Sequence, residues 1–254
     1  MKTIILCDGP RPIEISKLSR TYGLGIEVQA FCVPELYLEN NLQGIEQVKE
    51  EIKGIPFNSF HGPYRDLNTG TPDKLISNVV KFRYQQAFDI ACELNISHMV
   101  FHNGCLKRDK RYESWIKNSI IFWLDFLSDK SENFNFFIEN LFEHSPELIL
   151  YIINAINKKN VKACLDIGHA HCYTDHSVMT WIQELGNSIG YVHMHDNDGS
   201  SDSHSDFGEG NIPLVEVCEC LENYAPDTIW SLETDGGDTQ KSINWLLEKG
   251  YLKR

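Results

Sequence analysis

The stretch FNFFIENLFEHSPELILYIINAIN, residues 134–157, contains a complete strand–loop–helix unit. An apolar run of strand length comes first and leads into the charged residue Glu139. After a short polar loop, Ser145 can cap a helix that has Pro146 at its first position. The apolar residues that follow recur at helical spacing. A buried strand followed closely by an amphipathic helix is the repeating unit of parallel α/β folds.

The same pattern recurs along the chain on both sides of this stretch. Strands are expected at residues 3–7, 25–31, 57–64, 98–104, 134–141, 161–171, 189–197 and 228–234. Helices are expected at residues 12–23, 44–54, 112–127, 145–157, 176–186 and 238–252, and another after Pro72, with Thr71 as its N-cap. Eight evenly spaced strands in 254 residues predict a (β/α)8 barrel, formed as a single domain over residues 1–254. An open, doubly wound sheet is the less favoured alternative.

Composition narrows the classes of function. The formal net charge is −13 and the isoelectric point is near 5.2, so general binding to DNA or to an anionic membrane is not expected. The eight cysteines form no CxxC pair, and the short apolar run near the N-terminus does not resemble an export signal. No apolar stretch approaches the length of a membrane span. We therefore expect a cytoplasmic protein with reduced thiols.

Histidines and carboxylates follow six consecutive predicted strands. In a barrel, the loops at the carboxyl ends of the strands form the active face, so these side chains should meet there. The nine residues are His61, His102, Glu139, Asp166, His169, His193, Asp202, His204 and Glu233. Asp202 and His204 belong to the loop after the seventh strand, where an extended DSH segment would direct both side chains the same way. In the same loop, Gly208 and Gly210 allow a tight turn.

Five imidazoles and four carboxylates together predict a metal site. A lone histidine at a strand end is more often a structural residue, but carboxylates buried together repel one another unless a cation lies between them. The mixture of ligands suits zinc, manganese or iron(II), whereas calcium prefers oxygen ligands alone. His98 begins its strand and should lie at the opposite end of the barrel. His195 follows His193 by two residues and can face the same site, as a contact to substrate or behind a ligand.

The motifs HGPY, FHNG, IEN, DIGH, VHMHDN, DSH with GEG, and LET resemble those of the xylose isomerase-like TIM barrels, also described as AP endonuclease family 2. Within that superfamily they are most similar to the endonuclease IV branch. The resemblance implies two or three zinc ions held by the nine residues, with manganese or iron as alternatives. Sugar isomerases and epimerases of the superfamily keep a smaller set on one ion. Here that set corresponds to Glu139, Asp166, His193 and Glu233, and the two glutamates also move protons.

A basic loop and an aromatic residue complete the expected site. Tyr64 of HGPY matches a tyrosine of the endonuclease IV motif, and Arg65 follows it. Lys107 and Arg108 lie in the segment LKRDKRYE after the fourth strand, where they can anchor a phosphate. Arg11, after the first strand, is a further candidate. Tyr64, Arg65, Lys107, Arg108 and His195 are thus expected to bind substrate.

Four functions are considered for this pattern. The sequence favours a metal-dependent hydrolase that cleaves a phosphoester bond in a small phosphorylated or nucleotide-like molecule, with Glu139 and Glu233 as catalytic residues. The alternative is a sugar or sugar-phosphate isomerase or epimerase that uses one metal and the same two glutamates. An AP-site endonuclease is less favoured, because the chain is acidic and the loops after the first two strands look short. A binding protein without activity is least favoured, because the ligand set is complete.

Overall fold

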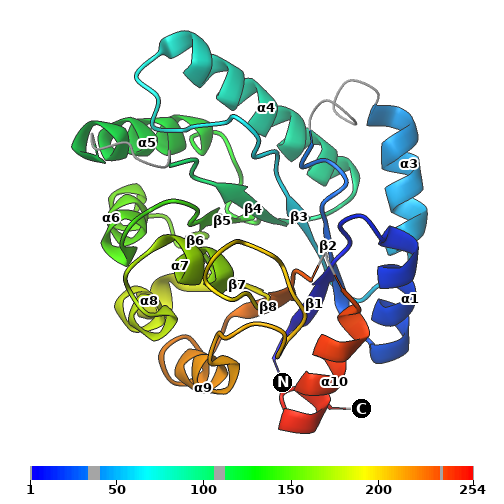
Figure 1. The fold of residues 1–254 in the computed structure, drawn as a ribbon. Helices are drawn as coiled ribbons and strands as arrows, with labels where there is room; N and C mark the ends of the chain where they lie inside the picture. Colours follow the sequence, from blue (N-terminus) through cyan, green and yellow to red (C-terminus); the bar gives the residue numbers. More distant parts are fainter. Residues whose placement is uncertain (1, 34–40, 106–111, 235–236, 254) are drawn as a thin grey trace.

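The computed structural model describes residues 2–33, 41–105, 112–234 and 237–253. Eight parallel strands form a closed barrel, each paired with its neighbours in sequence and the last paired with the first (Figure 1). The strands are β1 (Ile4–Cys7), β2 (Gly25–Val28), β3 (Asn58–His61), β4 (His98–His102), β5 (Asn135–Glu139), β6 (Val161–Asp166), β7 (Ile189–Met194) and β8 (Ile229–Leu232). The predicted (β/α)8 barrel is confirmed.

Helices surround the barrel on its outside (Figure 1). They are α1 (Pro12–Tyr22), α3 (Asn41–Ile52), α4 (Lys74–Glu93), α5 (Tyr112–Phe126), α6 (Pro146–Ile156), α7 (Ile167–Tyr173), α8 (Val178–Leu185), α9 (Leu214–Tyr224) and α10 (Thr239–Lys249), with a 3-10 turn at Gly186–Ser188. Among the described residues, none of these helices combines the length and apolar composition that a bilayer span requires. None of the eight cysteines, all of which are described, belongs to a disulfide.

Alternate residues of each strand face the two sides of the barrel wall, and β4 shows this well. Met99 and Phe101 point outward into the large core between strands and helices. Val100 points inward, where it packs with Ile5, Phe137, Cys164 and Tyr191. This inner cluster fills the barrel, so any site must lie at one of its open ends.

The strand register brings the expected ligands to the same end. His102 on β4 is paired with Glu139 on β5, and Asp166 on β6 is paired with His193 on β7. Each of these residues is at or next to the last position of its strand. Parallel pairing therefore places these ligands on one rim.

The structure differs from the sequence predictions in three local details. The sixth strand ends at Asp166, and residues 167–173 form α7, whose first turn is capped by the Asp166 side chain. Thr71 is not the N-cap of α4: Asp73 is, because its carboxylate accepts from the backbone N–H groups of Leu75 and Ile76. The sequence pattern predicts no helix at α9, which follows the long loop after β7.

Candidate metal centre

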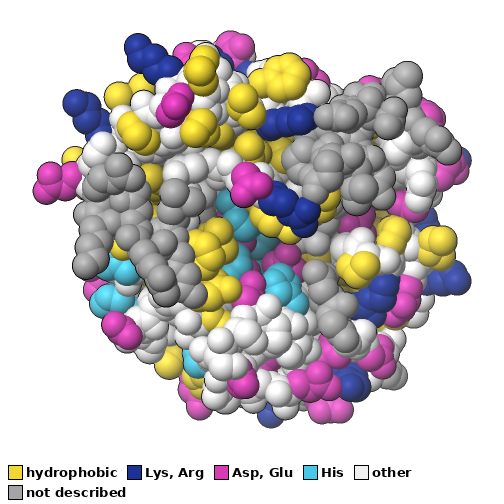
Figure 2. All heavy atoms as spheres, turned by 45° about the horizontal axis from the view of Figure 1, so that its top comes forward, with side chains coloured by type: hydrophobic (Ala, Val, Ile, Leu, Met, Phe, Trp, Pro, Cys, Tyr) yellow, Lys and Arg dark blue, Asp and Glu magenta, His cyan; other side chains and the backbone are white. Residues whose placement is uncertain are grey.

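A cavity of about 630 Å3 opens at the carboxyl end of the barrel. Figure 2 shows this face with histidine and acidic side chains gathered at the bottom of a central hollow. The polar lining comes from the rim of the barrel and the loop after β7, and a partly apolar wall faces it. The lining residues are Gly9, Pro10, Gln29, Ala30, Cys32, Val33, His61, Tyr64, His102, Glu139, Leu141, Phe142, His169, Asp202, His204 and Glu233.

Glu139, at the end of β5, lies between four imidazoles. Its Oε2 atom is 3.2 Å from Nε2 of His61 and 3.2 Å from Nε2 of His102. Its Oε1 atom is 3.2 Å from Nδ1 of His193 and 3.6 Å from Nδ1 of His169. The carboxylate is 1% exposed, so these contacts replace water almost completely. Glu139 would therefore be among the residues that hold a divalent metal at this site.

His193, on β7, is the centre of a second group. Besides Glu139, its Nδ1 atom is 3.3 Å from Oε2 of Glu233 and 3.8 Å from Oδ2 of Asp166. These residues come from β7, β5, β6 and the position after β8. Three carboxylates around one imidazole nitrogen form a ligand set that suits a divalent cation. We call Glu139, Asp166, His193 and Glu233 the central group.

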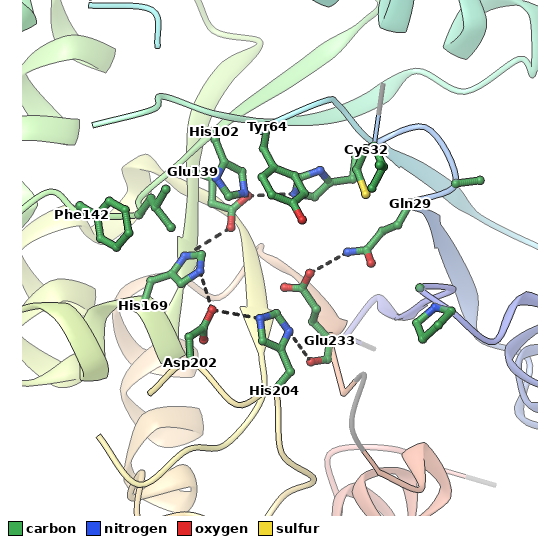
Figure 3. Close-up of a pocket in the computed structure, with 16 residues that line it drawn as sticks. Gln29, Cys32, Tyr64, His102, Glu139, Phe142, His169, Asp202, His204 and Glu233 are labelled. Carbon is green, nitrogen blue, oxygen red and sulfur yellow. Dashed lines mark hydrogen bonds and ion pairs between the residues drawn. The ribbon is translucent and has the colours of Figure 1, made fainter. Parts of the chain in front are cut away.

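Asp202 forms a third group with His169 and His204. Its Oδ2 atom is 3.1 Å from Nε2 of each imidazole (Figure 3). His204 has a φ of +45°, in the left-handed region that side chains other than glycine rarely occupy. The expected extended DSH segment is therefore wrong, and the backbone turn at His204 is what directs its ring back toward Asp202.

The loop that carries this third group is held from inside by Asp196. Its carboxylate accepts hydrogen bonds from the backbone N–H groups of Asn197, Gly208 and Ile212. Gly208 has a φ of +86°, as a tight turn requires, which confirms the turn expected there. A buried carboxylate with three backbone donors rigidifies the segment that presents Asp202 and His204.

Backbone carbonyl groups fix the orientation of three imidazoles. The Nδ1 atoms lie 2.8 Å from the Gly62 carbonyl oxygen in His61, 2.8 Å from that of Asn140 in His169, and 3.2 Å from that of Glu233 in His204. A carbonyl only accepts, so Nδ1 carries the proton and Nε2 presents its lone pair to a carboxylate. That arrangement is repulsive unless a second proton or a cation lies between them. The residues present therefore fit a divalent metal.

The pKa shifts of the histidines agree with a site that fits a divalent metal. Burial alone would lower the pKa of His169, but Asp166 and Asp202 raise it to about 10. For His204, the carboxylates of Glu233 and Asp202 likewise overcome burial and raise the pKa to about 10. Metal and protons therefore compete for the same lone pairs. His102 is the exception: burial lowers its pKa to about 3, so this imidazole is neutral and available as a ligand.

Two further histidines, His195 and His98, lie outside the cavity lining. His195 is fully buried and does not line the cavity: its Nε2 atom is 3.2 Å from Oδ1 of Asp166, and its ring stacks on His204. His195 therefore lies behind Asp166 and away from the cavity, a position that does not support the expected contact to substrate. His98 lies at the opposite end of β4, as expected, near Ser97 and Asn135.

The expected substrate-binding residues are only partly brought together. Tyr64 lines the cavity and stacks on His102 with ring centroids 5.0 Å apart. Arg65 is exposed and does not belong to the lining. The Arg11 guanidinium donates to the carbonyl oxygens of Thr234 and Gly237, so it holds the backbone after β8. Lys107 and Arg108 lie outside the described residues.

Sequence reasoning missed two polar residues contributed by the segment at β2. Glu27 is fully buried beside His193, and Gln29 lies beside Glu233. The available signal was the alternation in GIEVQAF, where Glu27 and Gln29 are two residues apart and therefore face the same side of an extended segment. The structure thus adds a polar contribution from the second strand.

Comparison with known proteins identifies the family. Residues 23–249 match the family described as xylose isomerase-like TIM barrel. The chain belongs to that family. An uncharacterized protein of Methanocaldococcus jannaschii is 30% identical over 199 residues, which are 74% of this chain and 68% of the relative.

Solved structures with the same fold include sugar epimerases. A D-tagatose 3-epimerase-like protein is 24% identical, with a TM-score of 0.80 over 99% of this chain and 97% of that one. A D-psicose 3-epimerase, crystallised in the presence of D-fructose, is 17% identical, with a TM-score of 0.73 over 99% of both chains. An AP endonuclease of family 2 from Brucella melitensis is 14% identical, with a TM-score of 0.75 over 100% of both chains. At these identities the likeness concerns the fold.

Proposed function

We propose that the protein is a sugar isomerase or epimerase that depends on a divalent metal. The central group supplies the ligands for one ion. The observation that carries the proposal is the placement of Glu139 and Glu233. They come from β5 and from the end of β8, and they reach the same nitrogen of His193 at 3.2 Å and 3.3 Å. Both also line the cavity, so each can contact a bound sugar.

The two glutamates suit proton transfer at a carbon next to a carbonyl group. A metal bound to the central group would polarise that carbonyl and the neighbouring hydroxyl oxygen. One carboxylate then removes the proton from the carbon, and the other delivers a proton from the opposite side. Because Glu139 is 1% and Glu233 7% exposed, bulk water competes poorly for the carbanion. Asp166 and His193 would help to hold the ion.

The cavity wall favours an uncharged polyhydroxylated substrate. None of the described residues that line the cavity is a lysine or an arginine. Tyr64 and Phe142 present aromatic rings, as the C–H faces of a sugar prefer, and the metal-binding residues offer polar contacts for its hydroxyl groups (Figure 3). The epimerase activity of the structural neighbours supports the same choice.

Solvent deuterium tests this proposal. Ketohexoses and ketopentoses are incubated with the metal-loaded protein in D2O, and deuterium at the carbon next to the carbonyl is followed by NMR. We expect incorporation by wild type, and its loss in Glu139→Gln and Glu233→Gln. Glu216→Gln, at an exposed position of α9, is the matched control and should keep full activity. Lack of exchange in the wild type across the panel would contradict the proposal.

A phosphoester hydrolase is the second candidate, and one observation favours it. Two further ligand groups flank the central one: His61 and His102 beside Glu139, and His169 with His204 beside Asp202. Sugar isomerisation needs one ion, whereas phosphoester hydrolysis gains from several, which stabilise the attacking and leaving oxygens. Two or three tightly bound ions per chain, together with turnover of small phosphoesters and no sugar exchange, would favour the hydrolase.

A further inference from the structure

We propose that Glu27 and Gln29 are positioning residues that set up the central group for its metal. Glu27 acts on His193, and Gln29 acts on Glu233. This inference rests on the proposed function in one respect, namely that the central group binds a divalent ion. It holds for either of the two reactions considered above.

Glu27 lies directly behind the His193 imidazole. The Nε2 atom of His193 is 3.0 Å from Oε1 and 3.1 Å from Oε2 of Glu27. Tyr191 donates its hydroxyl hydrogen to the same carboxylate, and Ser59 lies 2.8 Å from the Tyr191 oxygen. All four side chains are fully buried. The carboxylate is therefore held in place from the interior of the barrel.

This contact decides which nitrogen of His193 can bind metal. Nδ1 faces three carboxylates, among which a divalent cation would bind, whereas Nε2 faces Glu27 alone. With a cation on the Nδ1 side, the hydrogen of the neutral imidazole lies on Nε2, because an ionised carboxylate only accepts hydrogen bonds. The lone pair is then on Nδ1, which faces Glu139 and Glu233. His61, His169 and His204 are anchored through Nδ1 instead, and by backbone carbonyl groups. A carboxylate partner makes an imidazole a stronger ligand than a carbonyl partner does.

Gln29 orients the carboxylate on the other side of the group. Its Nε2 atom donates to Oε1 of Glu233 at 2.7 Å (Figure 3). The same atom lies 3.3 Å from Oε1 of Glu27. Its own backbone N–H donates to Oδ1 of Asp8 at 2.7 Å, which fixes the start of the side chain. With Oε1 of Glu233 occupied by the amide, Oε2 is the atom that faces His193.

The segment that contains Glu27 and Gln29 thus orients two members of the central group, His193 and Glu233. The Gln29 amide links these two contacts, because it reaches both Glu27 and Glu233. The paired carboxylate behind His193 should make the central group the tightest of the metal-binding groups. Replacement of Glu27 should therefore weaken the first equivalent of metal that the protein takes up. Replacement of Gln29 should change the geometry at Glu233.

The test is a Co2+ titration of the metal-free, full-length protein, followed by visible absorption, because the Co2+ spectrum reports ligand geometry. We expect Glu27→Leu to weaken the first Co2+ equivalent by about 10- to 100-fold, which is the usual effect of removing such a partner. Glu27→Gln keeps an acceptor for His193 and should weaken binding of the first Co2+ equivalent less, by about tenfold. Gln29→Leu should alter the spectrum. Gln47→Leu, at an exposed position of α3, is the control.

Unchanged affinity and an unchanged spectrum in Glu27→Gln and Gln29→Leu would overturn the inference. If Glu27→Leu fails to fold, Glu27→Gln gives the same test, because glutamine has the same length and loses only the charge. Failure of the wild type to bind Co2+ is a different result: it would overturn the metal-dependent function itself, before any variant is compared.

Discussion

Two histidines of β4, His98 and His102, lie four residues apart at opposite ends of the barrel. Both have a lowered pKa, and burial is the main cause in both. They differ in what surrounds them. His98 is near the neutral groups of Ser97 and Asn135, whereas His102 is 3.2 Å from the Glu139 carboxylate and within 6 Å of the His61 and His169 rings.

The difference shows how one strand can place two histidines in different surroundings. Val100 lies between them and belongs to the apolar cluster that fills the barrel, so the two ends are separated by packed side chains. At the His98 end, an imidazole completes hydrogen bonds. At the His102 end, the carboxyl termini of the strands bring carboxylates and imidazoles together in a cavity. The residue type is the same, and its position along the strand decides its chemistry.

The largest effect is expected from neutralising the Glu139 carboxylate, at the His102 end of the barrel. In Glu139→Gln, we expect deuterium exchange into the sugar substrate to fall by about a hundredfold to ten-thousandfold, the usual contribution of a general acid or base. Metal content should fall as well, because Glu139 contacts four of the imidazoles in the site. Exchange is measured by NMR at saturating metal. Activity within threefold of wild type would show that Glu139 has no catalytic role.

The two histidines themselves give a matched pair. His102→Asn should weaken metal binding by about 10- to 100-fold, within the range known for changes at a metal site. His98→Asn should leave it unchanged, because His98 lies beyond the packed interior. Isothermal titration of the metal-free proteins with Zn2+ measures both. Equal effects of the two substitutions would mean that the separation of the barrel ends is wrong.

The buried carboxyl group of Asp8 tests how much a charge at the carboxyl end of the barrel lowers stability. Burial raises the pKa of Asp8 to about 8. From about pH 4 to pH 8 the folded protein holds a proton that the unfolded chain has released, so stability falls as pH rises through this window. Asp8→Asn lacks that proton, so its free energy of unfolding relative to wild type should rise with pH. The rise should be at most about 1.4 kcal/mol per pH unit. Urea unfolding in excess chelator measures this, and a pH-independent difference would argue against the raised pKa.

The smallest expected effect concerns a glycine that makes room for a histidine. A Cβ at Gly168 would lie 1.9 Å from Cε1 of His195, which is too close for any side chain. Gly168→Ala should therefore lower the free energy of unfolding by about 1–3 kcal/mol, as overpacking does. It should also displace the ring that contacts Asp166. Thermal unfolding measures the first effect, and wild-type stability in the variant would show that the ring has room to move.

Much of the fold and of the site could be predicted because position along a strand carries the information. The rule that barrel sites lie at carboxyl ends identified the residues that the structure brings together, from His61 to Glu233, and it separated His102 from His98. It missed Glu27, because a single charged residue inside an apolar strand gives no signal of its partner. It also missed the left-handed turn at His204, because a backbone angle in a long polar loop depends on tertiary contacts such as those of Asp196.

The most direct test of the account is the metal content of freshly purified protein, measured by elemental analysis with no metal added. The geometry at Glu139, His193 and Asp202 predicts at least one zinc, manganese or iron ion per chain, and its loss from Glu139→Gln. Protein that contains none of these metals, and binds none after incubation with each, would contradict the metal centre. The gathering of histidines and carboxylates at this end of the barrel would then need another explanation.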